Sequence, residues 1–208
     1  MRPLSKLISF LFQPLLMPLY GTFILLNTSS YISFTIFPAL RNALYIVILF
    51  STFLLPAITF LFMLKRKQID SLEMQTRAER NMPYISTLLF YAAGWYLLNK
   101  LPLPRAFGNI VMGASLVIFI AYLINLRWKI SIHMIGLGGL AGLLFAFATM
   151  FNIELAIPLA LLMAFAGITG TARMYLNAHI PSQIYAGFLV GFGVEWLFVY
   201  IGNLSLYF

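Results

Sequence analysis

The stretch "IHMIGLGGLAGLLFAFATMF", residues 132–151, decides the class of fold, because it runs for a full span length without an acidic residue, lysine or arginine. A bilayer hydrocarbon core of about 30 Å needs roughly 20 mostly apolar residues in a helix. Of the 208 residues in the chain, 62% are hydrophobic and 9% are charged, whereas a soluble domain carries roughly 25% charged residues. The sequence therefore predicts an all-α fold, a polytopic transmembrane helical bundle of six to seven spans, as a single transmembrane domain over residues 1–208.

Seven apolar segments, separated by short polar breaks, account for nearly the whole chain. The first segment has the basic start of a signal peptide, but its apolar run is too long and no small-x-small cleavage site follows, so we expect a retained span. The third and sixth segments are the shortest. The segments are Ile8–Leu26, Ala43–Leu64, Tyr84–Leu98, Phe107–Leu126, Ile132–Phe151, Leu155–Ile168 and Pro181–Ile201.

The cations are unevenly divided between the two ends of this predicted bundle. Seven spans place the N-terminus and residues 65–83, 127–133 and 170–180 on one side, here called side A, which holds ten of the thirteen lysines and arginines. The positive-inside rule then makes side A cytoplasmic, unless its cations serve to bind phosphate. The net charge of +8 fits membrane topology and contact with membrane lipids better than binding to nucleic acid, so we expect no nucleic acid partner. The compact size and short loops suggest a bacterial cytoplasmic (inner) membrane protein.

Two glycine pairs and one acidic residue stand out inside the apolar segments. Gly138 with Gly142, and Gly187 with Gly191, have the small-xxx-small spacing that lets membrane helices approach closely. Glu195 lies well inside the last segment, where an ionisable side chain is costly. We expect it to be hydrogen-bonded between helices or to line a polar pathway.

Both histidines of the chain, His133 and His179, fall on side A at the start of a segment. Neutral histidine can attack phosphorus or an acyl centre and can exchange protons near neutral pH. Arginine, here Arg173, holds phosphate oxygens through two parallel hydrogen bonds. The absence of cysteine excludes a thiolate metal site and a cysteine nucleophile. These residues indicate phosphoryl chemistry, and the alternative is that each histidine is a hydrogen-bonded structural residue.

The local sequence around each histidine favours an anion site. Pro181 suits the first turn of a helix, which leaves His179 just outside the N-terminus of the last segment. Ser131 can cap the fifth segment, with His133 in its first turn and Lys129 just before it. Two helix N-termini then present unpaired N–H groups to one region, which favours phosphate. Two histidines without nearby carboxylates or thiolates give too few ligands for zinc, so we expect no metal site.

The motifs around these residues resemble those of the type-2 phosphatidic acid phosphatase superfamily. Its third motif, S-R-x(5)-H-x(3)-D, is similar to Ala172, Arg173, His179 and Gln183 in register. Its second motif, P-S-G-H, is similar to "ISIH", residues 130–133. The first motif, K-x(6)-R-P, has no clean counterpart, although Arg77, Arg80 and Pro83 lie in the corresponding loop. The resemblance covers about residues 65–195, within a phosphatase-like core of about residues 65–201.

The resemblance implies a lipid phosphatase whose catalytic face is side A, acting without a cofactor on a lipid or isoprenoid phosphate or diphosphate. His179 would be the nucleophile that forms a phosphohistidine, and His133 would be the general acid. Gln183 would take the position of the aspartate that orients the nucleophile. The implied substrate-binding residues are Arg173 and Ser131, with Arg80, or Arg77 as the alternative, in place of the first motif. The local sequence adds Lys129 to this set.

The departures from the family motifs keep a second reading open. Gln183 offers an amide oxygen without charge, and the Arg–Pro pair of the first motif is missing. The alternative is therefore a weakened or inactive relative that binds a lipid phosphate or serves as a structural membrane subunit. A transporter is a third reading, supported only by Glu195 and by prolines within the spans. Hydrolysis against phosphotransfer, the identity of the lipid and the formation of a homo-oligomer stay open.

Overall fold

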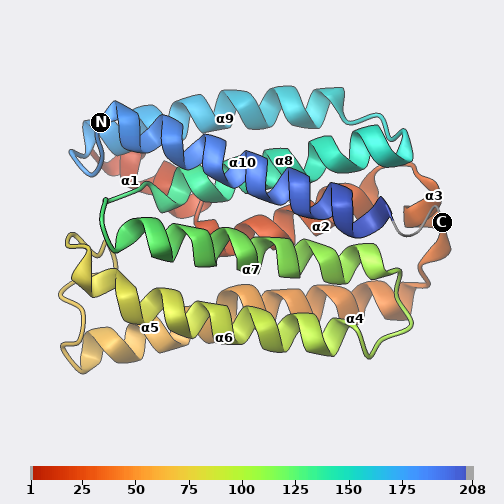
Figure 1. The fold of residues 1–208 in the computed structure, drawn as a ribbon, viewed down its shortest axis with the longest axis horizontal. Helices are drawn as coiled ribbons and strands as arrows, with labels where there is room; N and C mark the ends of the chain where they lie inside the picture. The colour runs from red at the N-terminus through yellow and green to blue at the C-terminus, as the bar shows by residue number, and fades with distance from the viewer. Residues whose placement is uncertain (1, 205–208) are drawn as a thin grey trace.

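The computed structural model describes residues 2–204, which form a bundle of helices aligned along its long axis, with no strand among them (Figure 1). Six helical stretches have the length and apolarity to cross a bilayer, which confirms the all-α polytopic bundle. Helix α6, the predicted third segment, runs beside α7 but is too polar to count among the six. The elements are α1 (Arg2–Leu11), η1 (Pro14–Leu16), α2 (Met17–Asn27), α3 (Tyr31–Thr35), α4 (Pro38–Ile48), η2 (Leu49–Leu54), α5 (Leu55–Lys65), η3 (Ala78–Arg80), α6 (Asn81–Leu98), α7 (Arg105–Asn125), α8 (Ile132–Phe151), α9 (Ala156–Tyr175) and α10 (Pro181–Leu204).

The first predicted segment is broken in the structure. We expected one helix over Ile8–Leu26, but α1 ends at Leu11 and α2 begins at Met17, with a short 3₁₀ turn between them. Pro14 and Pro18 cause the break, because proline has no N–H to donate and its ring clashes with the preceding turn. As a result α1 leaves the line of α2 and packs against α9.

The sixth predicted segment was wrong at its C-terminal end. We expected the helix to stop at Ile168, but α9 continues through Gly170 and ends at Tyr175, so that Arg173 lies in its last turn. Gly170 does not break the helix because it packs against Ile184 and Met134. Packing offsets the roughly 1 kcal/mol propensity cost of a glycine in a helix.

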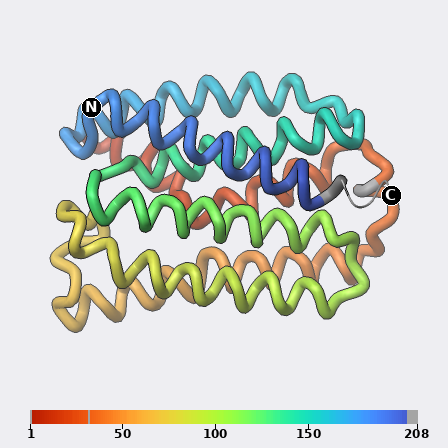
Figure 2. Tube along the Cα trace, in the orientation of Figure 1, coloured from red at the N-terminus to blue at the C-terminus, as the bar shows by residue number. Residues whose placement is uncertain are grey.

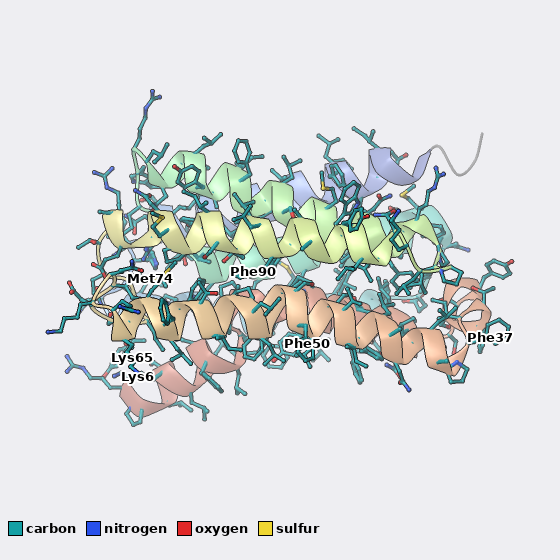
Figure 3. All side chains as sticks on the ribbon, turned by 90° about the horizontal axis from the view of Figure 1, so that it is seen from below. Lys6, Phe37, Phe50, Lys65, Met74 and Phe90 are labelled. Carbon is teal, nitrogen blue, oxygen red and sulfur yellow. The ribbon has the colours of Figure 1, made fainter. Side chains whose placement is uncertain are left out.

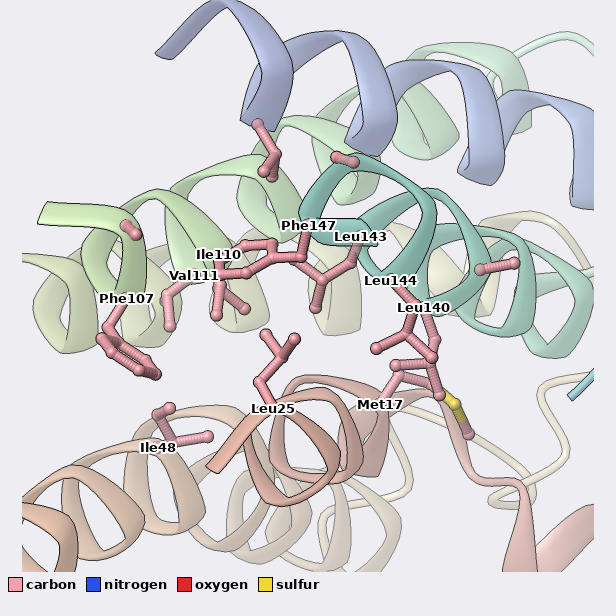
Figure 4. Packing of buried hydrophobic residues seen from close by; sticks show 14 of the residues in the cluster. Met17, Leu25, Ile48, Phe107, Ile110, Val111, Leu140, Leu143, Leu144 and Phe147 are labelled. Carbon is pink, nitrogen blue, oxygen red and sulfur yellow. The ribbon is translucent and has the colours of Figure 1, made fainter. Parts of the chain in front are cut away.

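The pair α8 and α10 forms the most closely packed part of the bundle. A Cβ atom on Gly138 or Gly142 would collide with the backbone of α10, and one on Gly191 would collide with that of α8. The predicted close approach at these glycines is therefore confirmed. The other side of α8 packs against α2 and α7 through buried apolar side chains that include Leu25 and Phe147 (Figure 4).

The segments assigned to side A gather at one end of the bundle. Helix α1, the loop after α5, the loop between α7 and α8, and the loop between α9 and α10 all lie at the left end of the view (Figures 1 and 2). Lys6, Lys65 and Met74 lie at this end, and Phe37 lies at the opposite one (Figure 3). The predicted grouping of loops is confirmed, and both histidines lie at the side A end.

Candidate functional site

A cavity of about 590 Å³ reaches from the side A end into the bundle. Its polar end is lined by two histidines and two arginines: His133, His179, Arg80 and Arg173. Its remaining walls are mainly apolar and come from α1, α2, η2, α5, α6, α7 and α8. The cavity therefore has a polar end and mainly apolar walls elsewhere.

The turn between α9 and α10 brings His179 to Arg173. Ala178 N–H donates to Arg173 C=O at 3.1 Å and Asn177 N–H donates to Met174 C=O at 2.8 Å, which is the Schellman arrangement for ending a helix. Asn177 takes the left-handed conformation that this motif needs, with φ of 53°. His179 comes directly after this motif, and Pro181 starts α10. The six residues from Arg173 to His179 therefore span a single tight turn.

Gln183 contacts the imidazole of His179. The distance from His179 Nδ1 to Gln183 Oε1 is 2.9 Å, and the same oxygen accepts from Ile180 N–H at 3.4 Å. An amide oxygen only accepts, so Nδ1 carries the proton and the Nε2 lone pair stays available. Gln183, at the predicted orienting position, thus favours the tautomer of His179 in which Nε2 carries no proton.

His179 is 7% exposed. Burial is the main cause that lowers the pKa of His179, to about 4 from 6.5. The hydrogen bond that His179 donates to Gln183 raises this pKa, while the charges of Arg80, Arg173 and Lys129 lower it further. His179 is therefore neutral at neutral pH.

Arg173 is 6% exposed and faces the cavity from the last turn of α9. Its Nη1 donates to Ser9 Oγ at 3.3 Å. Its buried Nε has no hydrogen-bond partner among residues 2–204. A buried donor left unpaired costs about 1–3 kcal/mol, a cost that an anion bound at Nε would remove.

The structure separates the two arginines proposed for the missing first motif. Arg80 is 4% exposed, lines the cavity, and donates from Nε to Met74 C=O and from Nη1 to Ile130 C=O, both at 3.0 Å. Burial lowers the pKa of Arg80, against smaller raising effects of Tyr84 and Glu79. Arg77 is exposed, does not line the cavity, and donates to Arg127 C=O at 2.5 Å. The site therefore includes Arg80 and not Arg77.

Of the residues around the second motif, His133 lines the cavity, whereas Ser131 and Lys129 do not. The Nε2 of His133 lies 3.1 Å from Ser9 C=O. Ser131 takes the predicted N-cap position of α8, but its side chain makes no capping bond, and its fully buried Oγ has no partner within residues 2–204. Lys129 is half-buried and does not line the cavity, and its pKa is lowered by burial and then by Arg80 and Arg173.

Two parts of the site lie outside the family motifs: Ser9, which the sequence did not indicate, and Glu195, which we expected to be hydrogen-bonded between helices or to line a polar pathway. Ser9 on α1 touches both Arg173 and His133. Glu195 is 3% exposed and lines the cavity, with its carboxylate against Gly113 of α7. The only sequence signal for Ser9 is its spacing of one helical turn from Ser5 in a basic opening segment.

Fold and site together define an integral membrane protein with a cationic, histidine-containing pocket at one end of its helical bundle. Residues 108–206 match the model of the PAP2 superfamily, and this part of the chain belongs to that superfamily of type-2 phosphatidic acid phosphatases. The match covers His133, Arg173, His179 and Gln183, whereas Arg80 and Ser9 lie outside it. No curated protein and no solved structure matches the chain.

Proposed function

We propose that the protein is a membrane-embedded lipid phosphatase that hydrolyses a lipid or polyprenyl phosphate or diphosphate. The observation that carries the proposal is the free Nε2 of neutral His179 at the cationic mouth of an apolar cavity. A phosphorylated amphiphile has matching chemistry, because its anionic head suits Arg80 and Arg173 and its hydrocarbon chain suits the cavity walls. Membership of the PAP2 superfamily supports the same substrate class.

The proposed reaction has two steps. His179 Nε2 attacks phosphorus, and the bond from phosphorus to the leaving oxygen breaks. His133, protonated on both ring nitrogens once the anionic substrate is bound, supplies the Nδ1 proton to that oxygen. Water then attacks the phosphohistidine and gives a proton back to His133 Nδ1, the P–N bond breaks, and phosphate leaves. Arg80 and Arg173 hold the phosphoryl oxygens, where fixed positive charges stabilise the charge of the transition state. Lys129 adds positive charge near Arg80 and Arg173, whereas Ser131 is fully buried, does not line the cavity and has no part in these steps.

The direct test is phosphate release from a panel of lipid phosphates and diphosphates by the purified protein, with His179→Ala alongside. Release by the wild type alone supports the proposal. Equal release by both proteins on every substrate would contradict it.

A second candidate is a non-catalytic binder of lipid phosphate, because Gln183 gives His179 no negative partner. It predicts that the wild type retains lipid phosphates in a binding assay and releases no phosphate from them.

The proposed chemistry predicts an acid limb of kcat/KM at about pH 4. His179 must be neutral to attack, and its pKa is lowered to about 4, so the rate should hold from pH 7 to pH 5 and fall below that. The measurement is kcat/KM between pH 3.5 and 8, with thermal unfolding at each pH to separate inactivation from unfolding. A limb near 6.5, the ordinary value for histidine, would contradict the lowered pKa of His179.

We propose that side A faces the cytoplasm of a bacterium. Arg66, Lys67 and Arg127 are exposed and do not line the cavity, so phosphate binding does not explain them and the positive-inside rule applies. The sequence has no cysteine, so Ser71→Cys and Lys100→Cys each introduce a unique thiol. An impermeant thiol reagent on intact cells should label Lys100→Cys, which lies on the side opposite side A, and should label Ser71→Cys only after lysis. Labelling of Ser71→Cys in intact cells would reverse the assignment.

A further inference from the structure

Helix α1 turns its small polar residues toward the bundle and its large apolar residues outward. Ser5 and Ser9 are its buried residues, whereas Leu4 and Phe10 are 60% and 69% exposed. The helix lies before the family-matched segment and packs on α9, the helix that carries Arg173. Ser9 also lines the cavity, so α1 forms part of the wall beside the candidate site.

The hydroxyl of Ser9 is fixed in a direction that suits Arg173. Ser9 Oγ donates its own proton to Ser5 C=O at 2.9 Å. Its lone pairs are then free to accept from Arg173 Nη1, which lies 3.3 Å away. This contact holds one end of the guanidinium and leaves the unpaired Nε–H for an anion.

The carbonyl of Ser9 is available because α1 ends early. The N–H of Gln13 bonds to Phe10 C=O instead of Ser9 C=O, as happens where a helix terminates. His133 Nε2 lies 3.1 Å from this free carbonyl. Since a carbonyl only accepts, the contact puts the proton of His133 on Nε2, the opposite nitrogen from that in His179.

We propose that Ser9 is a positioning residue of the candidate site, which holds Arg173 through its hydroxyl and His133 through its carbonyl. The proposal rests on the proposed function in that it takes a phosphate group as the ligand. It extends the site beyond the segment that matches the superfamily. Ser9 acts on phosphate through Arg173 and on the leaving oxygen through His133.

The hydroxyl contact is tested by titrating inorganic phosphate into the full-length protein in detergent. The matched pair is Ser9→Thr and Ser9→Val, which have the same shape and differ in the hydroxyl group. A net hydrogen bond is worth about 1 kcal/mol, so Ser9→Val should weaken phosphate binding by about three- to tenfold. Ser9→Thr and the control Ser5→Ala, one turn away on the same buried face, should bind as the wild type does. Thermal unfolding of each variant shows whether the fold is retained.

The carbonyl contact is tested by ¹⁵N NMR of histidine-labelled protein, which contains only two imidazoles. A His133→Gln sample assigns the signals. We expect the proton on Nε2 in His133 and on Nδ1 in His179, and a proton on Nδ1 of His133 would overturn the carbonyl contact.

The outcomes separate this inference from the proposed function. If the wild type hydrolyses lipid phosphates and Ser9→Val binds phosphate normally, the role of the Ser9 hydroxyl is refuted while the phosphatase stands. If Ser9→Val weakens phosphate binding and the wild type releases no phosphate from lipids, the role of Ser9 stands and hydrolysis is refuted. If the wild type binds no phosphate, the inference fails.

Discussion

Replacing His179 by alanine is expected to lower kcat for lipid phosphate hydrolysis by about 10⁴-fold or more. Removal of a nucleophile from an enzyme that forms a covalent intermediate commonly costs this much, because the remaining groups only bind and polarise the substrate. The cavity and its arginines stay in place in the variant, so KM should change little. The measurement is phosphate release from a substrate that the wild type turns over.

Tyr185→Ala is the matched control for His179→Ala. Tyr185 lies on the same helix, α10, is 70% exposed, and does not line the cavity. Its replacement should leave kcat unchanged. A His179→Ala variant with wild-type kcat would remove His179 from the reaction and leave the phosphatase proposal without a nucleophile.

Replacing Gln183 by a carboxylate is expected to raise kcat by about tenfold to 100-fold. In serine proteases the loss of the orienting carboxylate costs about 10⁴, partly through the wrong histidine tautomer. Gln183 already selects the useful tautomer through its contact with Nδ1, so only the missing charge remains to be gained. Gln183→Glu keeps the length of the side chain, and Gln183→Asp restores the residue of the family motif.

The same substitutions should shift the acid limb of the pH profile upward. A negative charge beside His179 favours the imidazolium and raises its pKa, so the limb should move from about pH 4 toward 6.5. Gln183→Leu removes the acceptor and should lower kcat. Unchanged kcat and an unchanged limb in the Glu and Asp variants would show that residue 183 does not act on His179 during the reaction.

The ends of a helix were predicted best from the sequence where an apolar segment is flanked by polar residues. The bounds Ile132–Phe151 were correct, because a polar stretch precedes them and Asn152, in the left-handed conformation, ends the helix. The end of α9 was wrong because glycine and threonine signal a break only when nothing packs against them, and α8 and α10 pack against Gly170. Such packing is a tertiary property that local pattern does not contain.

The site was predictable where its residues share one turn of chain. Arg173, His179 and Gln183 meet because the turn between α9 and α10 brings them together. The choice between Arg80 and Arg77 was not predictable, since both lie in one polar loop and differ in which carbonyls they reach on the loop before α8. The role of Ser9 was not predictable either, because 164 residues separate it from Arg173 and only the tertiary fold brings the two together.

That separation has a consequence for biogenesis. Ser9 and Arg80 enter the membrane early in synthesis, while Arg173 and His179 emerge from the ribosome only with the last helices. The pocket can form only after α10 has docked against α8, so an incomplete chain stalled in the bilayer would carry Arg80 and would lack Arg173 and His179. Assembly of the pocket is therefore tied to completed insertion, and the part of the chain that matches the superfamily, residues 108–206, would lack Arg80 and Ser9 if made on its own.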